Sequence, residues 1–100
     1  MREIRLAKLD KTRPVLILTR EIALPAMRKV TVAPITSTIR GLTSEVRVGQ
    51  RNGLDHECVV ALDNITTIPQ TLLGKRIGYF FDEQESELSL GLSLAFDLPF

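Results

Sequence analysis

Residues 29–35 read K-V-T-V-A-P-I, and this stretch decides how the rest of the 100-residue chain is interpreted. Val30 and Val32 alternate with Thr31, which is the period of a strand with one buried face. Pro34 has no backbone N–H, so it predicts an edge, a bulge or the end of the strand at this point. The stretch therefore predicts a strand within a largely β protein.

Short apolar segments separated by turn residues surround this strand. Residues 15–18 form an apolar run that is short for a helix, and residues 45–48 alternate as E-V-R-V. Asn52-Gly53 is a strong turn signal before another apolar run. Besides residues 29–35, the predicted strands are 4–9, 15–18, 45–48, 58–62, 65–68 and 75–81. The last of these strands is predicted to carry Ile77, Tyr79 and Phe81 on one side.

The chain ends in a predicted helix. Asp82 can cap its first turn, Glu85 completes a capping-box arrangement three residues later, and the helix is expected to run to about Asp97. Two apolar stripes occur at helical spacing, one with Leu88, Leu92, Ala95 and Phe96, the other with Leu90, Leu94 and Leu98. One stripe is enough to pack on the protein's own sheet. The second therefore predicts a further buried surface.

Residues 1–100 are expected to form one domain, because no repeat, linker or low-complexity stretch interrupts them. The strands and closing helix predict a mainly β fold with a C-terminal α-helix, arranged as a small SH3-like barrel. A domain of this size is only marginally stable alone, which favours an oligomer. Fold class by itself assigns no function.

The composition narrows the class of protein. A single cysteine, Cys58, cannot form an internal disulfide. No apolar run approaches the roughly 20 residues that cross a bilayer, and the start does not resemble a secretion signal, so a cytoplasmic protein without a membrane partner is expected. The formal net charge is +1, with basic residues concentrated in the first 51 positions. That distribution permits an anionic partner, and a solvated surface of mixed charge is the equal alternative.

Few residues suit the usual catalytic constellations. His56 is the one histidine and follows a turn, which favours a surface position over a catalytic one. Cys58 opens an apolar strand, which favours an inert core thiol. No His or Cys pair has metal-ligand spacing and no Gly-rich phosphate loop precedes a helix, so neither a metal nor another cofactor is predicted.

Polar residues at strand ends remain as candidates. A polar connection spans residues 10–14, and another loop begins at residue 36. If the sheet order brings the two together, the Arg13 guanidinium can hold a phosphodiester and stabilise transition-state charge, while the Thr36 hydroxyl holds a non-bridging oxygen. The residues alone favour a plainer interpretation, a salt bridge at Arg13 and a strand end at Thr36. The candidates are Asp10, Lys11, Thr12, Arg13, Thr36, Ser37, Thr38 and Arg40.

Three blocks of sequence, in this order, resemble a known toxin family. They are T-R-P-V-L-I-L at residues 12–18, V-A-P-I-T at 32–36 and V-V-A-L-D-N-I-T-T-I at 59–68. Together with the terminal L-A-F-D-L, they resemble the MazF/PemK toxins over nearly the whole chain. The loop between Leu9 and Arg13 is shorter than in many members of that family.

The resemblance implies a homodimeric SH3-like barrel, the toxin of a type II toxin–antitoxin system, that is neutralised by a cognate antitoxin. It further implies cleavage of single-stranded RNA without a metal or other cofactor, by attack of the ribose 2′-hydroxyl on the adjacent phosphorus. Arg13 and Thr36 correspond to the family's catalytic pair, and Asp63 and Asn64 to a pair at the RNA groove. The remaining candidates, expected to bind RNA, are Asp10, Lys11, Thr12, Ser37, Thr38 and Arg40.

Two other functions stay open at the level of sequence. A CcdB-like toxin has the same fold but acts without catalysis by binding DNA gyrase, and Arg13 would then be dispensable. A plain RNA-binding barrel would bind RNA without cutting it. Incubation with RNA in EDTA separates the three, because only an endoribonuclease gives cleavage.

Overall fold

The computed structural model describes residues 1–99 and contains seven strands, one α-helix and five 3-10 turns. The strands are β1 (Arg2–Lys8), β2 (Thr12–Ile17), β3 (Lys29–Thr36), β4 (Glu45–Val48), β5 (Cys58–Ala61), β6 (Thr66–Pro69) and β7 (Leu73–Phe80). The 3-10 turns are η1 (Glu21–Ala26), η2 (Gln50–Asn52), η3 (Leu62–Asn64), η4 (Gln70–Leu72) and η5 (Asp82–Gln84). The α-helix, α1, spans Glu85–Ala95.

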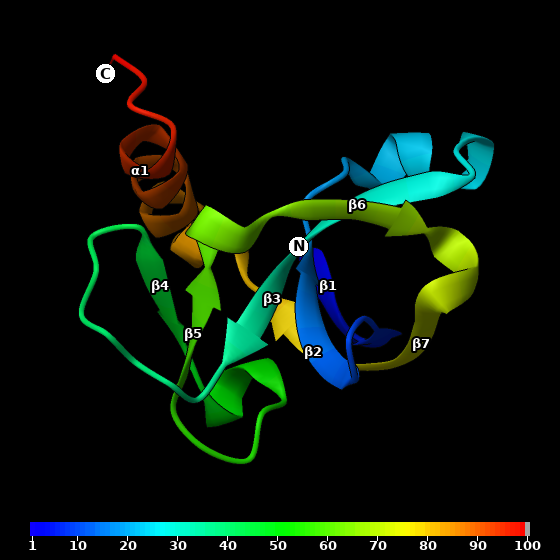
Figure 1. The fold of residues 1–100 in the computed structure, drawn as a ribbon, viewed down its shortest axis with the longest axis horizontal. Helices are drawn as coiled ribbons and strands as arrows, with labels where there is room; N and C mark the ends of the chain where they lie inside the picture. The colour runs from blue at the N-terminus through cyan, green and yellow to red at the C-terminus, as the bar shows by residue number, and fades with distance from the viewer. Residues whose placement is uncertain (100) are drawn as a thin grey trace.

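The strands form one antiparallel sheet in the order β4-β5-β3-β2-β1-β7, with β6 paired to β3 outside this order. Figure 1 shows the sheet curled into a half-barrel, with α1 beside the β4–β5 end. The predicted fold class, mainly β with a C-terminal helix, is confirmed. The first predicted connection is shorter than expected, because β2 already begins at Thr12 and includes Pro14.

β3 is a central strand, not an edge. On one side it pairs with β2, and on the other it pairs with β6 as far as Val32 and with β5 from Ile35. Pro34 lies between the part of β3 that pairs with β6 and the part that pairs with β5, and it forms no ladder pair on this side of β3. Its missing N–H therefore costs the sheet no hydrogen bond there. The prediction of an edge, a bulge or a strand end at Pro34 was wrong, because a change of partner accommodates the proline.

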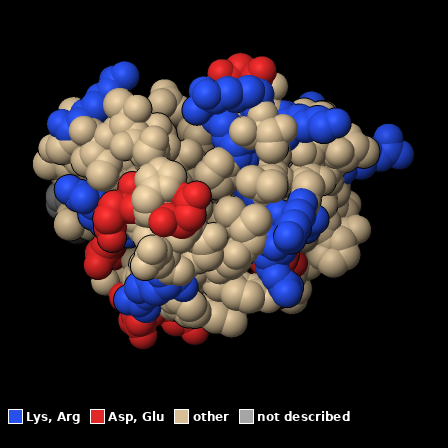
Figure 2. Space-filling model, turned by 90° about the horizontal axis from the view of Figure 1, so that it is seen from below, with Lys and Arg blue, Asp and Glu red and all other residues tan. Residues whose placement is uncertain are grey.

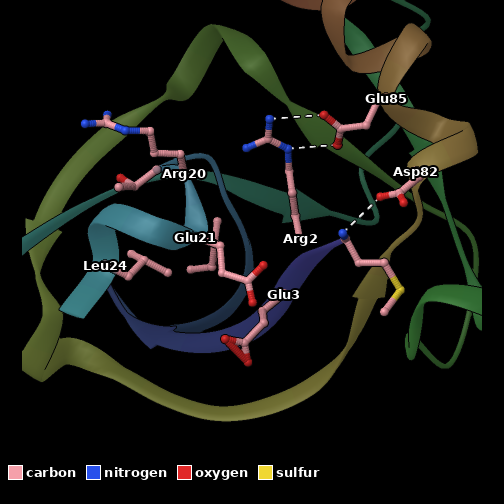
Figure 3. Close-up of a pocket in the computed structure, with 10 residues that line it drawn as sticks. Arg2, Glu3, Arg20, Glu21, Leu24, Asp82 and Glu85 are labelled. Atoms are coloured by element: carbon pink, nitrogen blue, oxygen red, sulfur yellow. Dashed lines mark hydrogen bonds and ion pairs between the residues drawn. The ribbon is translucent and has the colours of Figure 1, made fainter.

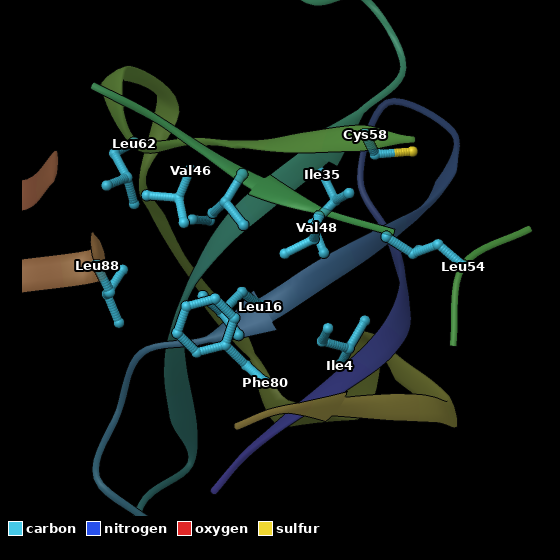
Figure 4. Close-up of a cluster of buried hydrophobic side chains, with 12 residues drawn as sticks. Ile4, Leu16, Ile35, Val46, Val48, Leu54, Cys58, Leu62, Phe80 and Leu88 are labelled. Carbon is cyan, nitrogen blue, oxygen red and sulfur yellow. The ribbon is translucent and has the colours of Figure 1, made fainter. Parts of the chain in front are cut away.

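Each face of the sheet covers an apolar cluster. Leu16 of β2 enters the larger cluster, where it meets Ile4 and Phe80 together with residues of β3, β4, β5 and α1 (Figure 4). Val15 and Ile17 of the same strand enter the second cluster on the opposite face. A strand that is buried on both sides needs apolar residues at successive positions. This explains why β2 reads as an unbroken apolar run.

β7 departs from simple alternation. Phe80 is the fully buried residue of this strand, whereas Ile77 and Tyr79 are only partly buried and Phe81 lies beyond the strand end. The pairing of β1 with β7 shifts register twice, which inserts extra residues on the β7 side. An inserted residue exchanges the faces of those that follow, so the predicted common side is not kept. Ile77 and Phe80, three residues apart, both pack in the larger cluster. Tyr79 instead packs beneath the Arg76 guanidinium, whose Cζ lies 4.8 Å from the ring centroid.

The start of α1 is organised by Gln84, not by the predicted cap. The Phe81 backbone N–H donates to the Gln84 side chain at 3.0 Å. Asp82 instead binds the N-terminal ammonium, at 2.9 Å. Glu85 accepts two hydrogen bonds from the Arg2 guanidinium, at 2.8 and 3.1 Å (Figure 3). The two acidic residues therefore fasten the beginning of the chain to the beginning of the helix.

One side of α1 packs on the sheet and the other is exposed. Leu88 is buried in the larger cluster, and Leu92 and Ala95 pack against it. Phe96 was expected on this side but is exposed, because α1 ends at Ala95, short of the predicted Asp97. Leu90, Leu94 and Leu98 are exposed as well. Within residues 1–99, no helix combines the length and apolar character needed to cross a membrane.

Asn52 joins three segments through a buried hydrogen-bond network. Its amide nitrogen donates to the Tyr79 carbonyl and to the Gln84 side chain, both at 2.8 Å. Its oxygen accepts the Gly49 backbone N–H at 3.1 Å. The next residue, Gly53, has a φ of +92° and would place a Cβ 2.0 Å from the Ile77 carbonyl oxygen. The predicted Asn-Gly turn therefore also connects η2 to β7 and η5 through hydrogen bonds and close packing.

Replacing Asn52 by alanine should lower the free energy of unfolding by about 2–4 kcal/mol, because several buried polar groups lose their partners at once. Urea unfolding of the purified protein measures this change. Gln50→Ala is the control, because that exposed amide makes only a 3.4 Å contact with the Asp55 carbonyl. Equal free energies of unfolding for the two variants would contradict a stabilising role of the Asn52 network.

Candidate functional site

A groove of about 310 Å³ opens where β2 begins and β3 ends. The β3–β4 loop contributes one wall, and the segment that follows β5 contributes another. Figure 1 shows the β3–β4 loop as a wide excursion at the side of the sheet. The residues that line the groove are Arg13, Thr36, Thr38, Arg40, Leu42, Glu45, Ala61, Asp63 and Asn64.

The β2–β3 register explains why Arg13 and Thr36 line the same groove. Val15 pairs with Pro34, Leu16 with Ala33 and Ile17 with Val32, so the numbers of each pair add to 49. Extending this register toward the β1–β2 hairpin sets residue 13 opposite residue 36. Side chains at directly opposed positions project from the same face of a sheet. The sequence could not determine this strand order, on which the proximity of the two residues depends.

Arg13 is held by a bidentate contact with Asp10. The Arg13 Nε donates to one Asp10 carboxylate oxygen at 2.9 Å, and Nη2 donates to the other at 3.1 Å. The Asp10 side chain is 70% exposed and that of Arg13 is 31% exposed. Since a guanidinium has five N–H donors, three remain available after this contact. Asp10 thus fixes the orientation of Arg13 without using all of its hydrogen-bonding capacity.

This contact keeps both groups charged. The hydrogen bond from Arg13 lowers the pKa of the Asp10 carboxyl from 3.8 to about 2, with help from the Lys11 backbone. The same contact raises the pKa of Arg13 above its ordinary value. At neutral pH the guanidinium therefore acts as a permanent cation and not as a proton acceptor.

Thr36 has its hydroxyl oriented by the chain that follows it. The Thr38 backbone N–H donates to the Thr36 Oγ1 at 3.1 Å. Because the hydroxyl oxygen accepts this bond, its own hydrogen can donate to a ligand. The ST-type turn also directs the chain from β3 into the loop wall. Arg13 and Thr36 thus present a cation and a hydroxyl donor to one groove.

The other polar groups of the groove are also held in place. The Ser44 hydroxyl donates to the Asp63 carboxylate at 2.6 Å. The Glu45 carboxylate accepts the backbone N–H groups of the loop that carries Arg40. Asn64 follows Asp63 in η3 and lines the groove beside it.

The structure brings most, but not all, of the predicted residues together. Thr38, Arg40, Asp63 and Asn64 line the groove with the Arg13–Thr36 pair, and Asp10 touches Arg13 from outside it. The groove lining does not include Lys11, Thr12 and Ser37, whose roles stay predictions. Sequence reasoning missed Glu45 and Ser44. Their position directly after a Gly-containing loop was the available signal, and it was interpreted only as the start of a strand.

His56 and Cys58 occupy the positions expected from the sequence. His56 is exposed and contacts Asp55, while Cys58 is buried, and burial raises the pKa of its thiol. Across residues 1–99, no group of three or more His, Cys, Asp or Glu is placed to hold a metal ion. A second cavity, of about 260 Å³, lies at the far end of β2 beside Arg2 and Glu85 (Figure 3). Arg2 and Glu85 are already paired there with each other.

Charge is interspersed on the surface. On the face seen in Figure 2, Lys and Arg side chains occur at several separate places, Asp and Glu side chains lie mainly toward the left and the edges, and neither sign covers the face. That view agrees with the mixed-charge interpretation of the sequence. On this face, an anionic partner would not meet an extended basic surface.

These features define a class of protein, a small half-barrel with one polar groove built around a fixed guanidinium and a hydroxyl. A family model described as "PemK-like, MazF-like toxin of type II toxin-antitoxin system" matches residues 3–96. The chain belongs to this family, in agreement with the resemblance of its three sequence blocks.

Individual relatives support the assignment. Endoribonuclease MazF3 of Mycobacterium tuberculosis is 54% identical over 98 residues, covering 98% of this chain and 95% of the relative. The structure of the Mycobacterium tuberculosis toxin MazF-mt6 matches with a TM-score of 0.96 at 52% identity, covering 98% of this chain and 99% of that one. An endoribonuclease from Mycobacterial species, in complex with its cognate antitoxin, matches with a TM-score of 0.86 at 23% identity, covering 98% and 94%. That third likeness supports the fold.

Removing Arg13 should return the Asp10 carboxyl toward its ordinary titration. In Arg13→Ala, the Asp10 pKa should rise from about 2 toward 3.8. Because the contact lowers the pKa of the carboxyl in the folded protein, its stabilising effect is fully present above the pKa of the unfolded chain. The effect is lost as the pH falls through the pKa of the folded protein. At pH 3.8 the parent Asp10 is therefore ionised, and the variant carries a larger protonated fraction. Carbon-13 NMR of the carboxyl measures the difference, with Arg76→Ala as the control. A midpoint unchanged by Arg13→Ala would contradict the contact.

Proposed function

We propose that this protein is a metal-independent endoribonuclease that cleaves single-stranded RNA in the groove between Arg13 and Thr36. What supports the proposal is that both residues line the groove, and that the β2–β3 register, continued from Val15 and Pro34 toward the hairpin, sets residue 13 opposite residue 36. The endoribonuclease names of its relatives supply the reaction class. A cytoplasmic location is part of the proposal, because cellular RNA is the substrate.

In the proposed reaction, the ribose 2′-oxygen forms a bond to the adjacent phosphorus and the bond from phosphorus to the 5′-oxygen breaks. The products are a 2′,3′-cyclic phosphate and a fragment with a 5′-hydroxyl. One proton leaves the attacking hydroxyl and one is taken up by the leaving oxygen. Carboxylates stand at or beside the groove at Asp10, Glu45 and Asp63.

Arg13 supplies charge stabilisation. Negative charge accumulates on the phosphoryl oxygens as the fifth bond forms, and a preoriented guanidinium stabilises that charge without reorganisation. Its raised pKa argues against a role as the base. Thr36 donates to a non-bridging oxygen and fixes the phosphate against Arg13. Asp63 and Asn64 offer an acceptor and an amide at the position where an unpaired base edge would lie.

The other two functions fit the molecule less well. A gyrase-binding toxin needs neither a fixed guanidinium nor a hydroxyl donor in a groove, and the relatives found carry endoribonuclease names. A plain RNA-binding barrel depends on exposed aromatic rings for stacking. Here Phe80 is buried and the Tyr79 ring is covered by Arg76, while the exposed Phe96 is not among the residues that line the groove.

Partners follow from the family and from the surface. A toxin of a type II system is neutralised by a cognate antitoxin, and an acidic antitoxin segment in this groove would occupy the phosphate positions. A second copy of the chain is the proposed cover for the apolar residues that α1 exposes, because single domains rarely leave such a face in water. The active form is accordingly a homodimer.

Arg13→Ala should lower RNA cleavage by about 1000-fold or more without unfolding the protein, since it removes a transition-state charge contact. Thr36→Ala should cost about 10 to 1000-fold, because a neutral hydroxyl contributes less. Cleavage of a fluorescent RNA in EDTA measures both. Arg76→Ala and Thr31→Ala are matched controls on other parts of the sheet and should retain activity. If a folded Arg13→Ala variant cleaved RNA at nearly the parental rate, the assignment of Arg13 to the site would be wrong.

Light scattering at micromolar concentration should give twice the 11.2 kDa mass of one chain. Leu94→Glu places a charge on the exposed face of α1 and should shift the mass toward one chain, whereas Ile22→Glu, on exposed η1, should not. Full cleavage activity at a mass near 11 kDa would show that pairing is unnecessary. A dimer that persists in Leu94→Glu would place the interface elsewhere.

A further inference from the structure

The β3–β4 loop is organised around one side chain, that of Glu45. Its Oε1 accepts backbone N–H groups from three successive residues, Arg40 at 3.2 Å, Gly41 at 2.9 Å and Leu42 at 3.1 Å. Its Oε2 accepts a second contact from the Arg40 N–H at 3.3 Å. The Glu45 backbone N–H returns a hydrogen bond to the Leu42 carbonyl at 3.1 Å. The carboxylate therefore occupies a concave nest of amides that its own loop provides.

Gly41 makes this geometry possible. Its φ is +77°, a left-handed conformation that disfavours other residues, and it lets consecutive N–H groups turn toward one point. An added Cβ would meet nothing within 4 Å, so the glycine is required for its backbone and not for space. The loop is thus shaped to surround a carboxylate at position 45.

The position of this nest links it to the groove. Glu45 begins β4 and pairs with Ala61 of β5, so its backbone is anchored in the sheet. Glu45, Arg40 and Leu42 all line the groove that contains Arg13. In the part of the chain that the structure describes, the Arg40 guanidinium has no carboxylate within ion-pair distance. The loop therefore presents an unpaired cation at the groove wall.

Electrostatics make the presence of Glu45 informative. A carboxylate that lines an RNA groove repels phosphate, so it lowers affinity unless it has another effect that outweighs the repulsion. Its four contacts with backbone N–H groups show what that effect is, since they fix three residues of a loop that has no strand pairing. A long cationic side chain binds more tightly when its backbone is already ordered, because less conformational entropy is lost on binding.

We propose that Glu45 is a positioning residue of the groove, which holds the Arg40–Leu42 segment so that Arg40 contacts an RNA phosphate beside the one at Arg13. This inference rests on the proposed function for its ligand. It assigns to Glu45 no part in proton transfer. Glu45 acts through Arg40 on the binding of RNA and leaves the chemical step to Arg13 and Thr36.

The effect should appear in KM and not in kcat. Glu45→Ala should raise KM for a short RNA about 10-fold with kcat within about twofold of the parent. If Glu45 acted only by repelling phosphate, removing its negative charge would lower KM. A rise in KM is therefore opposite to this direct electrostatic effect. Glu45→Gln should stay close to the parent, because an amide oxygen also accepts N–H bonds. Glu21→Ala, at the far end of the sheet, is the matched control and should change neither constant.

A double-mutant cycle with Arg40 tests the route of the effect. Arg40→Ala should raise KM by a similar factor, and the double variant should be no weaker than Arg40→Ala alone, since Glu45 acts through Arg40. Independent, multiplying losses in the double variant would overturn the proposal. A Glu45→Gln variant that loses kcat as severely as Arg13→Ala would also overturn it, by making the carboxylate part of the chemistry.

A measurement without RNA separates this inference from the proposed function. Amide hydrogen exchange by NMR should find the N–H groups of residues 40–42 protected in the parent and in Glu45→Gln, and exchanging at least 10-fold faster in Glu45→Ala. Unchanged protection in Glu45→Ala would overturn the positioning role even if the parent cleaves RNA. If the proposed function is wrong, the parent protein will not cleave RNA, even though its amide exchange shows the expected pattern.

Discussion

The antiparallel register between β2 and β3 is the constraint on which the site depends. It sets Val15 opposite Pro34 and, continued toward the hairpin, residue 13 opposite residue 36. Side chains in a sheet alternate strictly between faces, so a slip of one residue would send Arg13 and Thr36 to opposite sides. The register is fixed because both faces of these strands are buried. The same apolar packing that stabilises the fold therefore places the two polar residues of the site.

Burial on both faces also explains the shape of the molecule. β2 contributes alternate residues to two apolar clusters, and β3 changes its outer partner from β6 to β5 halfway along. A strand that pairs with two different strands on one side bends the sheet at the change, and Pro34 lies at this point. The bend brings the segment after β5 beside the end of β3, and so Asp63 and Asn64 reach the groove. The accommodation of the proline, the bend of the sheet and the groove wall formed by the segment after β5 all accompany this one change of partner.

Sequence patterns predicted the strands and the helix. They failed where contacts between distant segments determine which way a side chain faces or which partner it binds. The apolar run of β2 and the alternation at β4 are local signals, and both were confirmed. The facing of β7 could not be predicted, because the register shifts opposite Arg5 depend on how β1 lies against it. Asp82 and Glu85 had the spacing of a capping box, but the N-terminal ammonium and Arg2 compete for them. Arg13 and Thr36 were identified through family resemblance, since sheet order is not a local property. Glu45 was missed because a nest of amides has no sequence spacing of its own.

The groove also shows how a chain of net charge +1 can be suited to a polyanion. Each acidic residue at the groove is engaged by a donor of the protein itself, Asp10 by Arg13, Asp63 by Ser44 and Glu45 by backbone amides. The groove also contains donors, namely the remaining N–H groups of Arg13, the Thr36 hydroxyl and the Arg40 guanidinium. Phosphates supply only acceptors, so they match this arrangement group by group. Because mixed surface charge contributes little long-range attraction, the proposed binding of RNA relies on these contacts in the groove.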